Sequence, residues 1–164
     1  FLMYIKIDQP DADTERKILK LVRTEQRETK EQDPAWQEFS KTVGKIAVED
    51  ILTARREVLS MHVSESLEEY LVQLIVATRK PEKYDASLRD KILFGASPRA
   101  TIALDKCAKI NAWLDGRDFV TPEDIHAVIY DVLRHRIILS FEAQADGLTT
   151  DDIIASLLKT VPLP

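Results

Sequence analysis

The chain has 164 residues, 45% apolar and 31% charged, a balance that predicts one globular domain with a modest core and excludes disordered and collagen-like chains. Its longest apolar runs are far shorter than the roughly 20 residues that cross a bilayer, so no membrane insertion is expected. A net charge of -5 disfavours nucleic acid as a partner, and the single cysteine, Cys107, excludes an internal disulfide and predicts a reducing, cytoplasmic location.

Apolar residues alternate along residues 1–7, and this period of two predicts one β-strand that ends before Pro10. No second strand is predicted, and a single strand leaves its backbone groups unpaired. The chain also begins with Phe1 rather than Met. We therefore expect residues 1–10 to contribute the last strand of a sheet whose other strands lie upstream, and residues 11–164 to be a helical domain.

About six helices are expected after this strand, which makes the predicted fold class all-α. Asp11 or Asp13 is expected to cap the first helix, and its apolar face carries Ile18, Leu21 and Val22. The second helix is expected at residues 47–59, and the following side chains should face inward: Val48, Ile51, Leu52, Val58 and Leu59. The sequence does not predict how residues 22–45 pack.

The third helix is expected to begin at Ser64 or Ser66 and to end before Pro81. Its apolar stripe predicts a buried face with these members: Leu67, Tyr70, Leu71, Leu74, Ile75 and Thr78. A linker with an apolar patch at residues 92–94 is expected to follow it.

The next two helices have the clearest start signals. Ser97-Pro98 combines an N-cap serine with proline at the first helical position, and it predicts a helix over residues 98–114 that is ended by Gly116. Thr121-Pro122 repeats this signal and predicts a helix that reaches Arg136 or beyond. Its expected buried residues are Ile125, Val128, Ile129, Val132 and Leu133.

The last helix is expected to be short and to be capped by Thr150. Its apolar spacing predicts that the following residues are buried: Ile153, Ile154, Leu157, Leu158 and Val161.

The sequence holds no complete catalytic centre. Neither of the glycine-rich phosphate-binding patterns occurs, so this chain alone is not expected to hold a nucleotide tightly. His126 and His135 are nine residues apart on one predicted helix and face opposite sides, so no metal site is expected. Glu123 and Asp124 lie in a first helical turn, where capping is favoured over acid and base chemistry. Ser97 is favoured as a capping residue rather than a nucleophile.

Arg99 is the unusual residue, because a cation in a first helical turn opposes the helix dipole by roughly 0.3–1 kcal/mol. Unpaired N–H groups also point outward there, so Arg99 and the helix start together indicate an anion site. The alternative is a surface arginine that pairs with Asp85 or Asp105.

Three motifs occur in order along the chain: G-A-S-P-R-A at residues 95–100, G-R-D-F-V-T-P-E-D-I at residues 116–125, and V-L-R-H-R-I at residues 132–137. Together with H-V-S at residues 62–64 and A-T-R at residues 77–79, they resemble the C-terminal lid of the MoxR family of AAA+ ATPases. Residues 1–7 resemble the last strand of the ATPase core. The resemblance covers nearly the whole chain and is weakest across residues 22–45.

The resemblance implies a specific role for Arg99. In this family the helix that begins S-P-R-A supplies the sensor-2 arginine, which contacts the γ-phosphate of ATP, so Arg99 is the expected catalytic residue and Ser97 and Pro98 lie at the same nucleotide site. The phosphate loop and the Mg²⁺ ligands are expected outside this chain. The intact protein is then expected to be an ATPase that uses ATP and Mg²⁺, and this chain alone is expected to be inactive.

The resemblance also implies partners. These are the upstream AAA+ core, further copies of the protein in a hexameric ring, and client proteins with a von Willebrand factor A domain, on which the protein acts as a chaperone-like remodeller.

Two other functions stay open at this point. One is a helical adaptor that binds proteins and no nucleotide. The other is a helix-turn-helix DNA-binding module, although the connection at residues 115–121 is longer than the usual turn and the second helix begins with acids.

The basic run Arg134-His135-Arg136 also has two interpretations. On a helix its members spread over separate faces, which favours structural roles, with Asp131 and His135 as an i,i+4 pair. The alternative is a partner-binding basic cluster.

Overall fold

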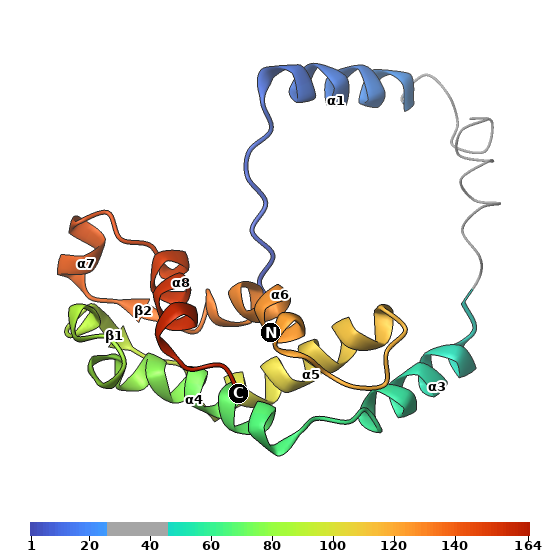
Figure 1. Ribbon diagram of the computed structural model, residues 1–164. Coiled ribbons are helices and arrows are strands. Elements are labelled where there is room, and N and C mark those ends of the chain that lie inside the picture. Colours follow the sequence, from blue (N-terminus) through green and yellow to red (C-terminus); the bar gives the residue numbers. More distant parts are fainter. Residues whose placement is uncertain (26–45) are drawn as a thin grey trace. The chain divides into compact units, whose positions relative to one another are not determined.

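A computed structural model describes residues 1–25 and 46–164 of the chain (Figure 1). The chain divides into two compact units, one made of Phe1–Ile5 with Ala54–Pro164 and the other of Lys6–Thr53. The assignment of residues 1–10 to an upstream core and of residues 11–164 to a helical domain stays a prediction. Most of residues 22–45, whose packing the sequence left open, lies outside the described residues.

The smaller unit contains helix α1 (Ala12–Glu25), which begins where the sequence predicted. The Asp11 carboxylate accepts a hydrogen bond from the Thr14 N–H at 2.8 Å and so caps the helix. The apolar face predicted for this helix is exposed at Ile18, Leu21 and Val22. Helical spacing marks a face that is suited to burial, but it does not say what covers that face.

Helix α3 (Val48–Leu59) gives the same lesson. It lies close to the predicted bounds, but it has no buried residue. Ile51 and Leu52 are more than half exposed, and of the predicted inward residues Val58 alone is partly buried. The predicted inward face of this helix is therefore wrong.

The hydrophobic core lies in the larger unit and is built mainly from four helices: α4 (Glu65–Arg79), α5 (Pro98–Leu114), α6 (Pro122–Leu133) and α8 (Thr150–Thr160). Every residue predicted to face inward on α4 and α6 is buried. On α8 the prediction is confirmed except at Leu158, which is partly buried.

Helix ends show where the sequence signals were misread. Thr149 rather than Thr150 caps α8: its hydroxyl accepts from the Asp152 N–H at 3.2 Å, and the Asp152 carboxylate accepts from the Thr149 N–H at 2.9 Å. This reciprocal box requires an acid three residues after the cap, which Thr149 has. Helix α6 ends at Leu133 rather than at Arg136, and the short helix α7 (Phe141–Ala145) was not predicted.

Two short strands were also missed. Strand β1 (Ile92–Phe94) pairs antiparallel with β2 (Ile138–Leu139), with Phe94 opposite Ile138, so the expectation of no second strand is wrong. The strands are too short for a clear alternating pattern, and they pair across a long stretch of sequence. Single-turn 3₁₀ helices at Pro81–Lys83 and Ala86–Leu88 occupy the predicted linker.

The strand predicted for residues 1–7 is not formed, because none of the described strands pairs with this segment. Its first residues instead lie against the end of α6, where the Tyr4 N–H donates to the Asp131 carbonyl at 2.8 Å. In the described part of the chain, no helix combines the length and the apolar character needed to cross a bilayer.

Candidate anion-binding site

The small sheet brings two distant motifs together. Strand β1 leads directly into Gly95 and the start of α5, and strand β2 begins just after Arg136. Because Phe94 pairs with Ile138, the start of α5 lies beside the segment that follows α6. The S-P-R-A and R-H-R motifs therefore meet at one place, although helices α5 and α6 separate them in the sequence.

The start of α5 is fixed on the end of α4. The Ala96 N–H donates to the Thr78 hydroxyl at 2.9 Å, and that hydroxyl donates to the Ile75 carbonyl at 2.7 Å. Thr78 is fully buried. Gly95 lies against the same turn, where an added Cβ atom would be 2.3 Å from the Thr78 carbonyl oxygen. Only glycine fits there, so these contacts set the position of the residues that follow.

Ser97 occupies the N-cap position with extended backbone angles, as predicted, and its carbonyl accepts from the Ala100 N–H at 2.8 Å. Its side chain, however, makes no capping hydrogen bond, so the expected capping role of the hydroxyl is wrong. Pro98 follows at the first helical position and has no N–H. The first turn of α5 therefore keeps backbone donors that no capping side chain occupies.

Arg99 is exposed in this first turn, and within the described residues it makes no hydrogen bond or ion pair. The acids proposed as its alternative partners are engaged elsewhere. Asp85 accepts from the Ser87 N–H and the Ser156 hydroxyl, and Asp105 pairs with Lys109 at 3.0 Å. The interpretation of Arg99 as an arginine bent onto one of these carboxylates is therefore wrong.

A cavity of about 340 Å³ lies at this meeting point. Its lining among the described residues comes from the N-terminal segment, the start of α5 and the residues after α6, and includes no acid: Phe1, Gly95, Ser97, Arg99, His135 and Arg136. A cavity with two arginines and a free helix start, without a carboxylate, is suited to a multiply charged anion.

Among the described residues, the acceptors that hold Arg136 in this cavity are carbonyl oxygens. Its guanidinium donates to Phe1 at 2.6 Å, to Leu2 at 3.1 Å and to Val132. No carboxylate of the described residues pairs with it, and burial lowers its pKa. Burial and the charge of Arg136 also lower the pKa of His135, which favours the neutral imidazole at pH 7.

Arg134, by contrast, is neutralised twice. It donates to Asp151 at 2.8 Å and to Asp131 at 2.9 Å, and so ties α6 to the start of α8. The structural role predicted for this residue is confirmed. The predicted pair of Asp131 with His135 is wrong, because the Asp131 carboxylate is taken by Arg134.

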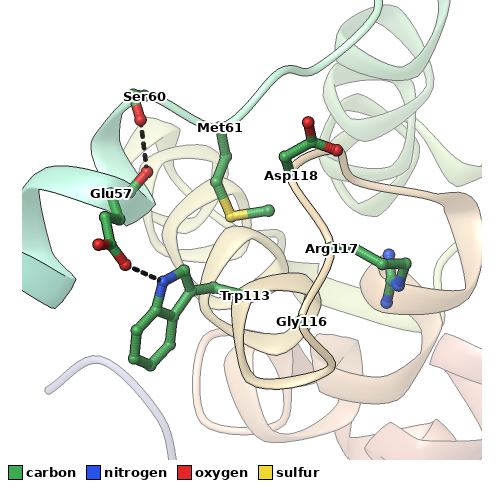
Figure 2. A pocket seen from close by; sticks show the side chains of 7 residues that line it. All are labelled: Glu57, Ser60, Met61, Trp113, Gly116, Arg117 and Asp118. Carbon is green, nitrogen blue, oxygen red and sulfur yellow. Dashed lines mark hydrogen bonds between the residues drawn. The ribbon is translucent and has the colours of Figure 1, made fainter.

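A second cavity measures about 620 Å³ and lies between the end of α3 and the end of α5, where the Trp113 indole donates to Glu57 at 2.8 Å (Figure 2). The cation in its lining, Arg117, is paired with Asp124 at 2.6 Å and with Asp115 at 3.0 Å. Its charge is therefore already neutralised, and we do not assign the anion site here.

Asp124 anchors this second cluster. Burial raises the pKa of its carboxyl, but hydrogen bonds from Arg117, the Thr121 N–H and Asn111 outweigh burial and hold the pKa well below its ordinary value. The bond from the Thr121 N–H measures 2.8 Å, so the predicted capping role of Asp124 is confirmed. Gly116 ends α5 with a φ of 74°, also as predicted.

The histidines form no metal-binding group. His126 is hydrogen-bonded to the Tyr70 hydroxyl at 2.8 Å, and His62 uses its backbone to bond Asp118 and Val120. Residues 1–25 and 46–164 contain no cluster of three or more metal-ligating side chains.

Comparison with known proteins places these motifs in a family. Residues 86–157 match the AAA lid domain family. The chain is 32% identical, over 165 residues, to the chaperone MoxR1 of Mycobacterium tuberculosis, and the match covers 100% of this chain and 40% of that protein. It is 42% identical over 72 residues to the protein MoxR of Methylorubrum extorquens, covering 43% of this chain and 21% of that protein. The chain carries an AAA lid domain of the MoxR family.

A solved structure agrees with this assignment. The crystal structure of a candidate ATPase from Cytophaga hutchinsonii superposes with a TM-score of 0.83 at 37% identity, and the match covers 100% of this chain and 47% of that protein. The chain thus spans less than half the length of these relatives. The all-α lid fold predicted from the sequence is confirmed.

Proposed function

We propose that this lid domain senses nucleotide for a MoxR-like AAA+ ATPase and that Arg99 binds the γ-phosphate of ATP. One observation carries the proposal: Arg99 projects from a first helical turn into a cavity without acids and has no partner among the described residues. The relatives named as a MoxR chaperone and a candidate ATPase support the nucleotide assignment.

The chemistry of the cavity fits phosphate. A guanidinium is planar and always charged, and its fork of N–H donors matches phosphate oxygens better than the point charge of lysine does. Negative charge is spread over the γ-phosphoryl oxygens during transfer, so a cation held in place there stabilises the transition state. Ser97 and Pro98 form the same helix start, and the Ser97 hydroxyl, which makes no capping hydrogen bond, can donate to a phosphate oxygen.

The fixed start of α5 connects Arg99 rigidly to the rest of the lid. Thr78 and Gly95 lock the first turn of α5 to α4, so a force on Arg99 acts on a buried core rather than on a mobile loop. Binding of the γ-phosphate is therefore expected to change the position of the lid as a body. ATP and Mg²⁺ are the proposed ligands of the intact protein, with the Mg²⁺ ligands outside this chain.

We further propose that lid movement drives chaperone-like remodelling of partner proteins, which the name of the relative MoxR1 supports. The hexameric ring and the von Willebrand factor A domain partners, which the family resemblance implies, stay predictions.

Substitution of Arg99 by Ala in the full-length protein tests the proposal. Loss of one positioned cationic donor should lower the ATP turnover rate about 10- to 1,000-fold, with a smaller effect on ATP affinity. Arg89→Ala is the matched control, because Arg89 is also exposed but lies outside the cavity, and it should leave turnover unchanged. Unchanged turnover in a folded Arg99→Ala protein would defeat the proposal.

A further inference from the structure

We propose that Arg136 is a second phosphate-binding residue in the Arg99 cavity, which extends the proposed function of Arg99 and rests on it. The ligand chemistry is the terminal phosphate group of a nucleoside triphosphate. The sequence marked Arg99 as an anion-site residue and Arg136 only as a member of a basic run, because Arg136 lies after the end of α6 and reaches the cavity through the β1 and β2 pairing.

The charge balance of the arginines singles out Arg136. Arg117 and Arg134 each bind two carboxylates. Arg136 is more than half enclosed, and it has carbonyl oxygens as its hydrogen-bond acceptors in the described part of the chain. Carbonyls satisfy N–H donors without cancelling the positive charge. An anion is therefore the missing counter-charge.

A second cation in the same cavity adds to the need for a bound anion. Arg99 and Arg136 both line the cavity, and no acidic residue of the described ranges 1–25 and 46–164 lines it. Two like charges that line the same open cavity repel each other, and a bound anion reduces this repulsion. A phosphate group between the two guanidinium groups removes the repulsion and satisfies both cations.

The geometry also holds Arg136 ready to bind. Its bonds to Phe1, Leu2 and Val132 fix the guanidinium, so little side-chain entropy remains to be lost on binding. A guanidinium has five N–H donors, and these three bonds leave donors free for a further acceptor. The residue thus combines a fixed position, an unbalanced charge and spare donors.

Equilibrium binding to the full-length protein tests the assignment, with a non-hydrolysable ATP analogue and ADP as probes. Arg136→Gln should weaken binding of the ATP analogue about 10-fold, because one charge-assisted contact is lost, and should change ADP binding less than about 2-fold. Arg136→Lys should retain part of the affinity. Arg89→Gln, the matched control, should bind both nucleotides normally.

The outcomes separate the two proposals. Normal binding of the ATP analogue by folded Arg136→Gln, with turnover lowered in Arg99→Ala, would overturn this inference and leave the proposed function intact. Equal weakening of ATP analogue and ADP would also overturn it, because the contact would not be at the terminal phosphate. If turnover is unchanged in Arg99→Ala, both proposals fail.

A measurement on the unsubstituted protein covers the case in which Arg136→Gln does not fold. Phenylglyoxal modifies accessible arginines, and mass spectrometry reads each position separately. The ATP analogue should slow modification of Arg136 at least several-fold relative to ADP, while Arg89 reacts equally in both. Equal modification of Arg136 with either nucleotide contradicts the assignment.

Discussion

The two cavities compared above, both lined by described residues, contain arginine and differ in how its charge is balanced. In the larger cavity Arg117 binds Asp115 and Asp124, and in the smaller one Arg99 and Arg136 share a space without acids. The same residue type therefore serves two purposes. A neutralised arginine holds the fold together, and an arginine whose charge is left open is available for a ligand.

Each cluster has its own structural logic. Asp124 is 1% exposed and accepts from Arg117, Asn111 and the backbone of Thr121, so it fixes the connection between α5 and α6. The position of Arg99 is instead fixed by the buried hydrogen bond between the Ala96 N–H and the Thr78 hydroxyl, which joins the start of α5 to α4. Stability is expected to depend on the first cluster and nucleotide chemistry on the second.

The largest stability effect is expected at Asp124. Replacement by Ala removes the cap of α6 and leaves Arg117 and Asn111 without their shared acceptor, which should lower the free energy of unfolding by about 3 kcal/mol. Asp115→Ala, which removes the exposed partner of the same arginine, should cost no more than about 0.5 kcal/mol. Urea denaturation measures both, and equal losses would contradict the structural role of the buried pair.

A smaller stability effect is expected at Gly95, where the second cluster meets the core. A Cβ atom there would lie 2.3 Å from the Thr78 carbonyl oxygen, so Gly95→Ala forces the backbone of α5 or α4 to move, at a cost of about 2 kcal/mol. The displaced α5 should also misplace Arg99 and lower ATP turnover per folded molecule. Normal stability and turnover in this variant would show that the contact does not position the sensor.

A smaller effect is expected in the pH dependence of stability, to which the Asp124 carboxylate contributes. The pKa of Asp124 is lowered from its ordinary value of 3.8, so its stabilising contribution is present above pH 3.8 and is lost as pH falls toward the pKa of the folded state. Asp124→Asn should remove up to about 1.4 kcal/mol per pH unit of this slope. Parallel stability curves for both proteins below pH 4 would contradict the lowered pKa.

Much of this fold was predictable because its signals are local. Ser97-Pro98 and Thr121-Pro122 mark helix starts through the geometry of proline and the capping residue, and Gly116 marks a helix end through its positive φ. The buried stripes of α4 and α6 were likewise predictable, because a wide apolar face at helical spacing fits a core.

Other features depend on partners that are distant in sequence. Strands β1 and β2 are too short to show a period, and their pairing depends on the folded core. The exposed apolar faces of α1 and α3 show that apolar spacing along a helix does not tell which other part of the protein packs against that face.

The candidate site was predictable in part. Arg99 is marked by its conflict with the helix dipole, which a single sequence reveals. Arg136 binds main-chain carbonyls, and every residue has a carbonyl, so no sequence pattern identifies those acceptors. Its unbalanced charge becomes visible only when the structure shows which acids lie near each arginine.

The central claim is that the two clusters divide stability from nucleotide chemistry, and ATP turnover per folded molecule tests it most directly. Turnover should be measured on full-length Arg99→Ala and Asp124→Ala, at a temperature where both are folded by circular dichroism. We expect turnover to fall about 10- to 1,000-fold in Arg99→Ala and to stay within about 2-fold of normal in Asp124→Ala. Normal turnover in Arg99→Ala, or an equal loss in both variants, would contradict the account.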